Sequence, residues 1–460
     1  MSDLRVCVDI GSTWTKALVV DPAATAAEAV SVVPATVSTP AWLRCEGVLA
    51  TAQLPTTLTT DVMDGVAGVV AALGEQVGAH PVVLGQPLVC SSAGGGLRLA
   101  VVGYELVVTA EAARRAAVSA GGRVVHLACG VLTAADVADL LAASADVVVL
   151  TGGTDGGDPD VLLANARTLA PALAAAGTPV VLAGNADVAQ QAEAALVSAG
   201  VPVTRTANVL PRIGSLNPLP AREAVRAAFL RHVIGGERLS RGRGLERLVL
   251  AATPDAVLAG VQRLATALGG GVLAVDVGGA TTDVYSVLSQ PAADSVEADV
   301  AGLEVASRTV EGDLGMRWSA PGVGEAVAAE QLQAGLLGPL PAASLLELAR
   351  RPEEVATGPD AARLDSDLAR AAAVTAVRRH ARPGTAGAPA RPLRDVALVL
   401  GSGGVLRHGD AARAEHVLAG VCSDHAGMWH VPDAAAQAVD RDYVLCALGL
   451  LALGAGAAAG

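Results

Sequence analysis

The first pattern along the chain is a pair of short apolar runs joined by a small polar segment. Residues 5–9 and 17–20 are rich in Val and other small apolar residues, and the segment between them carries Gly, Ser and Thr. Apolar runs of this length, separated by glycine and hydroxyl residues, are typical of two strands joined by a tight turn. The pattern predicts a β-hairpin over residues 5–20.

A second segment repeats this pattern far along the chain. Apolar residues 272–276 and 284–287 flank a polar turn at 277–283. At a constant offset of 267 residues the two segments share five identities, namely Val8/Val275, Asp9/Asp276, Gly11/Gly278, Thr15/Thr282 and Val20/Val287. This offset is too long for a solenoid repeat, so we expect two halves of a duplicated fold.

Between the hairpins, strand-length apolar runs alternate with Ala-rich helical segments. Strands are expected at 124–126, 147–150 and 180–182, and helices at 134–143, 159–175 and 186–199. Such alternation is typical of βαβ units on a parallel sheet. We therefore expect an inserted three-layer, Rossmann-like α/β domain at 120–210, followed by a Pro-rich linker and helical segment at 211–264.

The remainder completes an α/β fold with lobes at 1–115 and 265–460. In the second lobe, helices are expected at 323–336, 342–350 and 366–381, and a strand at 395–400 runs into a Gly-rich turn. The C-terminal segment 444–460 is apolar but interrupted by Gly, and it is short for a membrane span of about 20 residues. We expect it to form a buried helix, with no membrane association.

Composition narrows the function classes. The chain is 52% hydrophobic but only 2% aromatic, so its core must be built from small, closely approaching elements. A net charge of -13 opposes binding to a phosphate backbone, which argues against a nucleic-acid partner. The chain begins without a basic and apolar signal segment, which predicts a cytoplasmic protein.

The six cysteines are scattered along the chain without a C-x-x-C pair. This spacing argues against a zinc site, an iron–sulfur cluster or a disulfide framework, and it predicts reduced, mostly buried thiols. The histidines likewise show no metal-ligand spacing.

The two hairpins offer the groups that a nucleoside triphosphate needs, namely amides, hydroxyls and carboxylates that hold a hydrated Mg²⁺. The candidates in the first hairpin are Asp9, Gly11, Ser12, Thr13, Thr15 and Lys16, and those in the second are Asp276, Gly278, Gly279, Thr281 and Thr282. Asp9 and Asp276 are the expected catalytic residues and hold Mg²⁺ through water, and Asp276 is favoured for polarising an attacking water. A tight Gly turn would explain either hairpin alone, but their recurrence favours phosphate binding.

A third motif, Gly401-Ser402-Gly403-Gly404, follows an apolar strand and precedes a helical segment. Its amides can approach an adenine or ribose closely because glycine carries no side chain. By itself it is equally compatible with a strand-end glycine turn.

The order of these motifs resembles the actin, sugar-kinase and Hsp70 superfamily. Its phosphate motifs match 9–16 and 276–283, and its adenosine motif matches 401–404. The resemblance implies a two-lobed actin-like ATPase fold, a duplicated ribonuclease H-like unit, that binds ATP or ADP with Mg²⁺.

More narrowly, the chain looks like the MutL/GlmL-type accessory proteins of glutamate mutase, a family unrelated to the DNA-repair protein of similar name. The segments that carry this likeness are 9–16, 151–157, 183–187, 208–214, 276–283 and 311–317. The resemblance implies an adenosylcobalamin-dependent mutase as partner and a role as an ATP-driven, chaperone-like reactivase. It leaves a homodimer open.

Several interpretations remain open. Asp155 and Asp158 lie in or beside the loop 151–157, where they either contact a cation or a partner or belong to a flexible connection without a binding role. Glu311 or Asp313 either lines the nucleotide cleft or caps a helix. The turn at 91–96 lacks the ending of a P-loop, which favours a structural role. Besides a slow ATPase, the sequence allows a small-molecule kinase of the sugar-kinase type or a non-hydrolysing, nucleotide-dependent scaffold. A redox activator of 2-hydroxyacyl-CoA dehydratases is disfavoured because it needs closely arranged cysteines.

Overall fold

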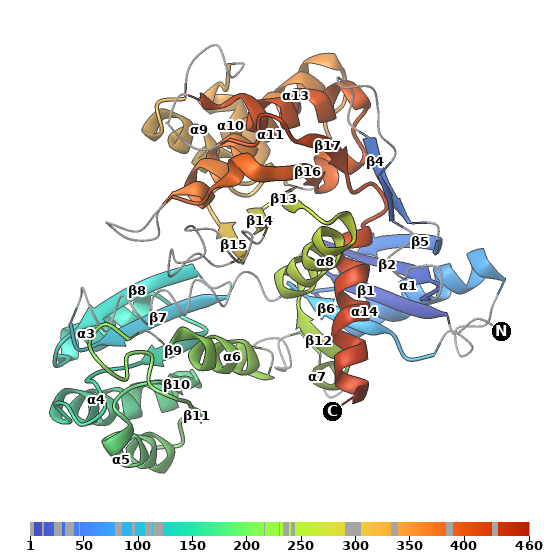
Figure 1. The fold of residues 1–460 in the computed structure, drawn as a ribbon. Helices are drawn as coiled ribbons and strands as arrows, with labels where there is room; N and C mark the ends of the chain where they lie inside the picture. Colours follow the sequence, from blue (N-terminus) through green and yellow to red (C-terminus); the bar gives the residue numbers. More distant parts are fainter. Residues whose placement is uncertain are drawn as a thin grey trace.

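The computed structural model describes most of the chain. It describes residues 4–459 except 12, 23–29, 33–40, 46, 79–84, 94–96, 106–112, 114–122, 216, 230, 233–238, 241–243, 290–304, 333–338, 353, 383–389 and 426–430. The described residues form a mixed α/β structure with three sheets (Figure 1).

The first sheet is built around the first predicted hairpin. Its strands, in spatial order, are β12 (Val249–Ala252), β6 (Leu88–Ser91), β1 (Arg5–Ile10), β2 (Trp14–Val20) and β5 (Val48–Pro55). β1, β2 and β5 are antiparallel neighbours, whereas β6 runs parallel to β1. Side chains alternate along β1, so Val6, Val8 and Ile10 share a core with α1 (Val62–Val77), while Cys7 belongs to the core on the opposite face.

The second sheet repeats this arrangement. Its strands, in the corresponding order, are β17 (Ala436–Val439), β16 (Val396–Ser402), β13 (Gly271–Val277), β14 (Thr282–Val287) and β15 (Ala306–Glu311). The strand directions also correspond, with β13, β14 and β15 antiparallel and β16 parallel to β13. The fold is therefore duplicated, and each half is organised around one hairpin.

Helices cover the outer face of the second sheet. They are α9 (Ala320–Ala329), α10 (Ala342–Arg350), α11 (Pro359–Ala381), the short α12 (Gly404–Arg407) and α13 (Ala411–Ser423), with a 3-10 turn at Leu393–Asp395. α11 carries Ala and Val on its core side, so it lies close to the sheet and buries Leu273 and Val275. The helix that the sequence predicted at 323–336 corresponds to α9, which ends at Ala329.

Two helices lie side by side between the sheets, α8 (Thr253–Leu268) and α14 (Val444–Ala459) (Figure 1). They approach closely because each has a glycine at the crossing. A Cβ atom on Gly260 would lie 1.9 Å from the Leu445 carbonyl oxygen, and one on Gly449 would lie 1.7 Å from the Ala256 carbonyl oxygen. Within the described residues, no helix has both the length and the apolar character needed to cross a bilayer.

The third sheet is entirely parallel. Its strands, in spatial order, are β8 (Arg123–Cys129), β7 (Arg98–Gly103), β9 (Val147–Leu150), β10 (Val180–Leu182) and β11 (Val203–Arg205). This 2-1-3-4-5 order is that of a doubly wound α/β sheet. One face packs against α3 (Ala134–Ala142), α4 (Asp160–Ala176) and α5 (Ala186–Ser198), and the other packs against α6 (Pro218–Phe229).

The sheets do not follow the expected boundaries everywhere. β7 lies inside the segment expected for the first lobe but pairs within the third sheet. The expected linker 211–264 contains α6, α7 (Leu245–Leu248), β12 and most of α8. In addition, β3 (Val30–Val32) and β4 (Ala41–Cys45) extend the second sheet beyond β17. A strand can complete a sheet that begins hundreds of residues away, and local sequence pattern does not report such pairing.

Candidate functional site

The two hairpin turns have the same geometry. Asp9 lies opposite Lys16 in the first hairpin, and Asp276 lies opposite Asp283 in the second. The Gly11 amide donates to the Trp14 carbonyl at 3.1 Å, and the Gly278 amide donates to the Thr281 carbonyl at 2.9 Å. A Cβ atom on either glycine would lie within 2.9 Å of that same carbonyl oxygen, so both turns require glycine. Ser12, expected in the first turn, lies outside the described residues.

Each turn is held by its carbonyl groups. In the first, the Thr56 hydroxyl donates to the Gly11 carbonyl at 2.8 Å, and the Thr56 amide donates to the Thr13 carbonyl at 2.9 Å. In the second, the amides of Met316 and Arg317 donate to the carbonyls of Gly278 and Gly279 at 3.0 and 2.8 Å.

This arrangement leaves amide groups at the tip of the second turn. Among the described residues, no hydrogen bond uses the amides of Gly279 and Ala280, and a Cβ atom on Gly279 would meet nothing within 4 Å. Backbone amides without a partner in a glycine turn are donors that an anionic ligand can use.

Asp9 is the most densely contacted of the candidate residues. Its carboxylate is 3% exposed and accepts hydrogen bonds from the hydroxyls of Thr253 and Tyr443, the latter at 2.9 Å. It also accepts from the Cys90 thiol at 3.5 Å and lies 3.8 Å from the Lys16 ammonium group. Thr253, Cys90 and Tyr443 were not among the sequence candidates, because nothing near them in the chain signals contact with Asp9.

Asp276 lies near Asp9. Burial raises the pKa of Asp276, and the charge of Asp9 raises it further, while Lys16 and Arg407 act in the opposite direction. The structure therefore brings the two expected carboxylates into one electrostatic environment with two cations.

The Gly-rich turn at 401–404 lies against the second hairpin. Ser402 pairs with Asp276 across the sheet, and Gly403 follows with a left-handed φ of 94°. A Cβ atom on Gly403 would lie 2.1 Å from the Val277 carbonyl oxygen and 2.9 Å from Oδ1 of Asp276. Only glycine allows this approach, whereas Gly404 beside it is exposed with nothing within 4 Å.

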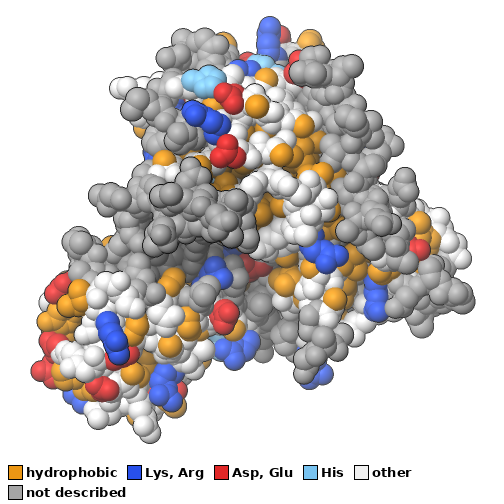
Figure 2. All heavy atoms as spheres, in the orientation of Figure 1, with side chains coloured by type: hydrophobic (Ala, Val, Ile, Leu, Met, Phe, Trp, Pro, Cys, Tyr) orange, Lys and Arg blue, Asp and Glu red, His pale blue; other side chains and the backbone are white. Residues whose placement is uncertain are grey.

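A cavity of about 300 Å³ opens beside Lys16 and Tyr443. Lys16 and Arg407 both lie over the Tyr443 ring, with their cationic groups 4.1 and 4.8 Å from its centroid. The charged residues that line the cavity include Lys16, Arg407, Arg441 and Asp442, so cations outnumber carboxylates and the cavity suits an anion. On the face drawn in Figure 2, the coloured Lys and Arg side chains are scattered and form no continuous basic area.

The threonine candidates differ in their surroundings. Thr13 is exposed, Thr15 is buried and shares a hydrogen bond of 3.1 Å with the Thr56 hydroxyl, and the Thr281 hydroxyl bonds Asp283. The Thr282 hydroxyl is buried with no partner among the described residues.

Asp283 and Asp313 lie at the edges of this region. Burial and the charge of Asp276 raise the pKa of Asp283 to about 7. Asp313, expected to bind nucleotide, accepts from Arg379 at 2.8 Å, and the same arginine donates to Glu311 at 2.8 Å. The structure thus places Asp313 in an ion-pair cluster.

The loop 151–157 at the carboxyl edge of the third sheet is tied down by side chains. Asp155 accepts from the Ala186 amide and the Asn208 side chain, both at 2.9 Å, and Asp158 accepts from the Tyr104 hydroxyl at 3.0 Å. Both acidic groups therefore have partners within the chain.

Comparison with known proteins identifies the family. The family model described as MutL protein matches residues 5–459. The chain belongs to the MutL protein family. Protein MutL of Clostridium tetanomorphum is 33% identical to this MutL-family chain over 477 aligned positions, covering 98% of the chain and 96% of the relative.

Among solved structures, this MutL-family chain has a distant match to nucleotide-free acetone carboxylase. The match has a TM-score of 0.30 and 13% identity, and it covers 68% of the chain and 48% of the carboxylase chain. A similarity this low carries no weight for the fold or the site.

Proposed function

We propose that this MutL-family chain is a two-lobed, actin-like ATPase that binds ATP with Mg²⁺ between its two hairpins and hydrolyses it slowly. We propose further that the nucleotide state controls its binding to an adenosylcobalamin-dependent mutase, such as glutamate mutase, which it protects or reactivates. The partner rests on the family resemblance. The chemistry rests on the site.

One observation supports the chemistry most directly. The two hairpins lie 267 residues apart in sequence and have corresponding strand pairing. In each, an aspartate near the end of the first strand precedes a glycine turn, and the two aspartates interact electrostatically. A tight turn alone does not require a carboxylate at its base. A pair of such turns beside Lys16 offers the groups that a polyphosphate with a divalent cation needs.

The residues present fit these ligands. The amides of Gly279 and Ala280 make no hydrogen bond among the described residues, Lys16 and Arg407 supply positive charge, and the orphaned Thr282 hydroxyl is a buried donor. Asp9 and Asp276 would hold the waters of Mg²⁺, whose charge would neutralise the phosphate oxygens. Gly403 and Gly404 would leave room for the nucleoside.

The chain's own residues then have distinct tasks. Asp276 has a raised pKa and only partial burial, so its carboxylate is suited to accept a proton from an attacking water. Asp9, fixed by three donors and Lys16, is suited to orientation rather than proton transfer. The hairpins belong to different sheets, so an intact triphosphate bound by both would link the two sheets. Hydrolysis of its terminal phosphate bond would weaken that link.

The test compares ATP turnover in Asp9→Asn, Asp276→Asn and the control Asp360→Asn, which alters an exposed carboxylate on α11. We expect each site variant to lower turnover about 100-fold, and the control to match wild type. Full turnover in both site variants would refute the assignment.

A second measurement addresses the partner. The chain is used to capture proteins from native extract with ATP, ADP or no nucleotide, and we expect retention of a cobalamin-dependent mutase to change with the nucleotide. Nucleotide-dependent capture without turnover identifies a scaffold. Rapid phosphorylation of a metabolite, with negligible hydrolysis in its absence, identifies a kinase.

A further inference from the structure

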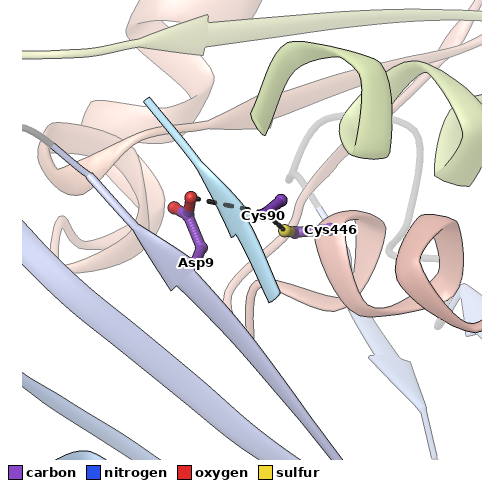
Figure 3. A group of neighbouring side chains, drawn as sticks. All are labelled: Asp9, Cys90 and Cys446. Carbon is purple, nitrogen blue, oxygen red and sulfur yellow. Dashed lines mark hydrogen bonds between the residues drawn. The ribbon is translucent and has the colours of Figure 1, made fainter. Parts of the chain in front are cut away.

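Three side chains from separate parts of the chain meet behind the first hairpin. Asp9 comes from β1, Cys90 from β6 and Cys446 from α14, and their ends point toward one another (Figure 3). The two sulfur atoms are 3.3 Å apart, and the Cys90 sulfur is 3.5 Å from Oδ1 of Asp9. All three residues are buried, and the three potential ligand atoms lie within 4.8 Å of one another.

The two separations that involve the Cys90 sulfur are close to those around a tetrahedral metal ion. Zinc binds thiolate sulfur at about 2.3 Å and carboxylate oxygen at about 2.0–2.2 Å, which places neighbouring ligand atoms about 3.5–3.8 Å apart. The observed sulfur–oxygen separation already falls in this range. The sulfur–sulfur separation needs to open by about 0.5 Å, which small side-chain rotations can supply.

The donor set also selects the kind of ion. Two thiolates with one carboxylate suit zinc or cadmium, whereas Mg²⁺ prefers oxygen ligands only. The hydroxyls of Thr253 and Tyr443 donate to the Asp9 carboxylate and fix its orientation, as hydrogen-bond partners of metal ligands generally do.

Charge balance points the same way. Two thiolates and one carboxylate carry three negative charges, and a divalent ion together with the Lys16 ammonium group beside Asp9 carries three positive ones. A neutral set of groups avoids the cost of burying net charge. Binding exchanges the two thiol protons for the ion and releases them to solvent, with no change of oxidation state.

We propose that Asp9, Cys90 and Cys446 form a binding site for a thiophilic divalent cation such as zinc. The ion ties α14 to two strands of the first sheet, so it stabilises the packing of the C-terminal helix. This site shares Asp9 with the proposed nucleotide site, whereas Cys90 and Cys446 belong to the cation site alone.

The test uses the full chain with Cys129, the exposed cysteine among those described, replaced by serine to remove background binding. The metal-free protein, kept reduced by a phosphine, is titrated with Cd²⁺ while the sulfur-to-cadmium charge-transfer absorption is recorded. We expect one ion per chain. Added Cys90→Ser or Cys446→Ser should each weaken binding at least about tenfold, since one ligand is lost in each. The matched control is Cys422→Ser, a buried thiol on α13, which should leave the titration unchanged.

Thermal unfolding gives a second readout. Zinc should raise the Tm of the Cys129→Ser background and of the Cys422→Ser control, but not that of the Cys90 and Cys446 variants. If the serine variants fail to fold, X-ray absorption of the zinc-loaded background protein decides, and two sulfur ligands are expected. Absence of sulfur ligands, or titrations unaffected by both site substitutions, overturns the proposal.

Discussion

Replacing Gly449 by alanine adds one methyl group where α14 passes closest to α8. The new Cβ atom would lie 1.7 Å from the Ala256 carbonyl oxygen, whereas an ordinary contact begins at 3.4 Å. The obstacle is helix backbone rather than the end of a flexible side chain, so it cannot rotate away. The two helices must therefore separate or shift along one another by roughly 1.7 Å.

The expected cost follows from two opposing effects. Alanine favours a helix over glycine by about 1 kcal/mol, which stabilises the variant. Forcing a methyl group into a closely packed contact costs about 1–3 kcal/mol, and a rigid backbone obstacle places this substitution at the upper end. The net loss is about 2 kcal/mol of unfolding free energy, which corresponds to a fall of a few degrees in Tm.

Gly454→Ala, on the same helix, is the matched control. Its Cβ atom would lie 3.2 Å from a methyl carbon of Leu88, which can move aside, so the gain in helix preference should prevail. Thermal unfolding followed by circular dichroism measures both variants. If Gly449→Ala raises Tm as much as Gly454→Ala does, the close crossing of α8 and α14 is wrong.

Three further predictions concern the region around the hairpins. Gly403→Ala should abolish ADP binding in calorimetric titration, because the added methyl group collides with the backbone of β13; retained affinity would count against the close approach. The pKa of Asp283 is raised to about 7 from an ordinary 3.8, so between these values the folded state keeps a proton that the unfolded state loses, and stability falls as pH rises. Asp283→Asn removes this group and should flatten the decline of Tm with pH over that window. Tyr443→Phe removes a hydrogen bond to Asp9 but keeps the ring, so it should lower the free energy of unfolding by about 2 kcal/mol and lower ATP turnover. Wild-type turnover together with wild-type unfolding would contradict this prediction.

The hairpins could be predicted because their signal is local. Each consists of an apolar strand that carries an aspartate, a glycine turn and a second strand, all within residues 5–20 or 271–287, and this pattern reports backbone conformation directly. The parallel strands β8, β9 and β10 were similarly expected from alternating runs, since they follow one another closely in sequence, whereas β7 and β11 were not predicted.

The partners of Asp9 could not be predicted in the same way. Tyr443 and Thr253 reach it from 434 and 244 residues away, and their selection depends on how α14 and α8 pack. The pairing of Cys90 with Cys446 depends on the same packing, so cysteines that look scattered in sequence become neighbours in the fold. The local sequence pattern predicts helices and strands, whereas long-range side-chain contacts of this kind follow from tertiary packing.

The position of α14 has a consequence for the synthesis of the protein. A ribosome finishes the first hairpin early, but one of the two hydroxyls that donate to its aspartate arrives only with the tyrosine at position 443. β4 likewise waits for β17 before it can pair within its sheet. A nascent chain that has not reached this point therefore lacks both the Tyr443 hydrogen bond to Asp9 and the sheet partner of β4.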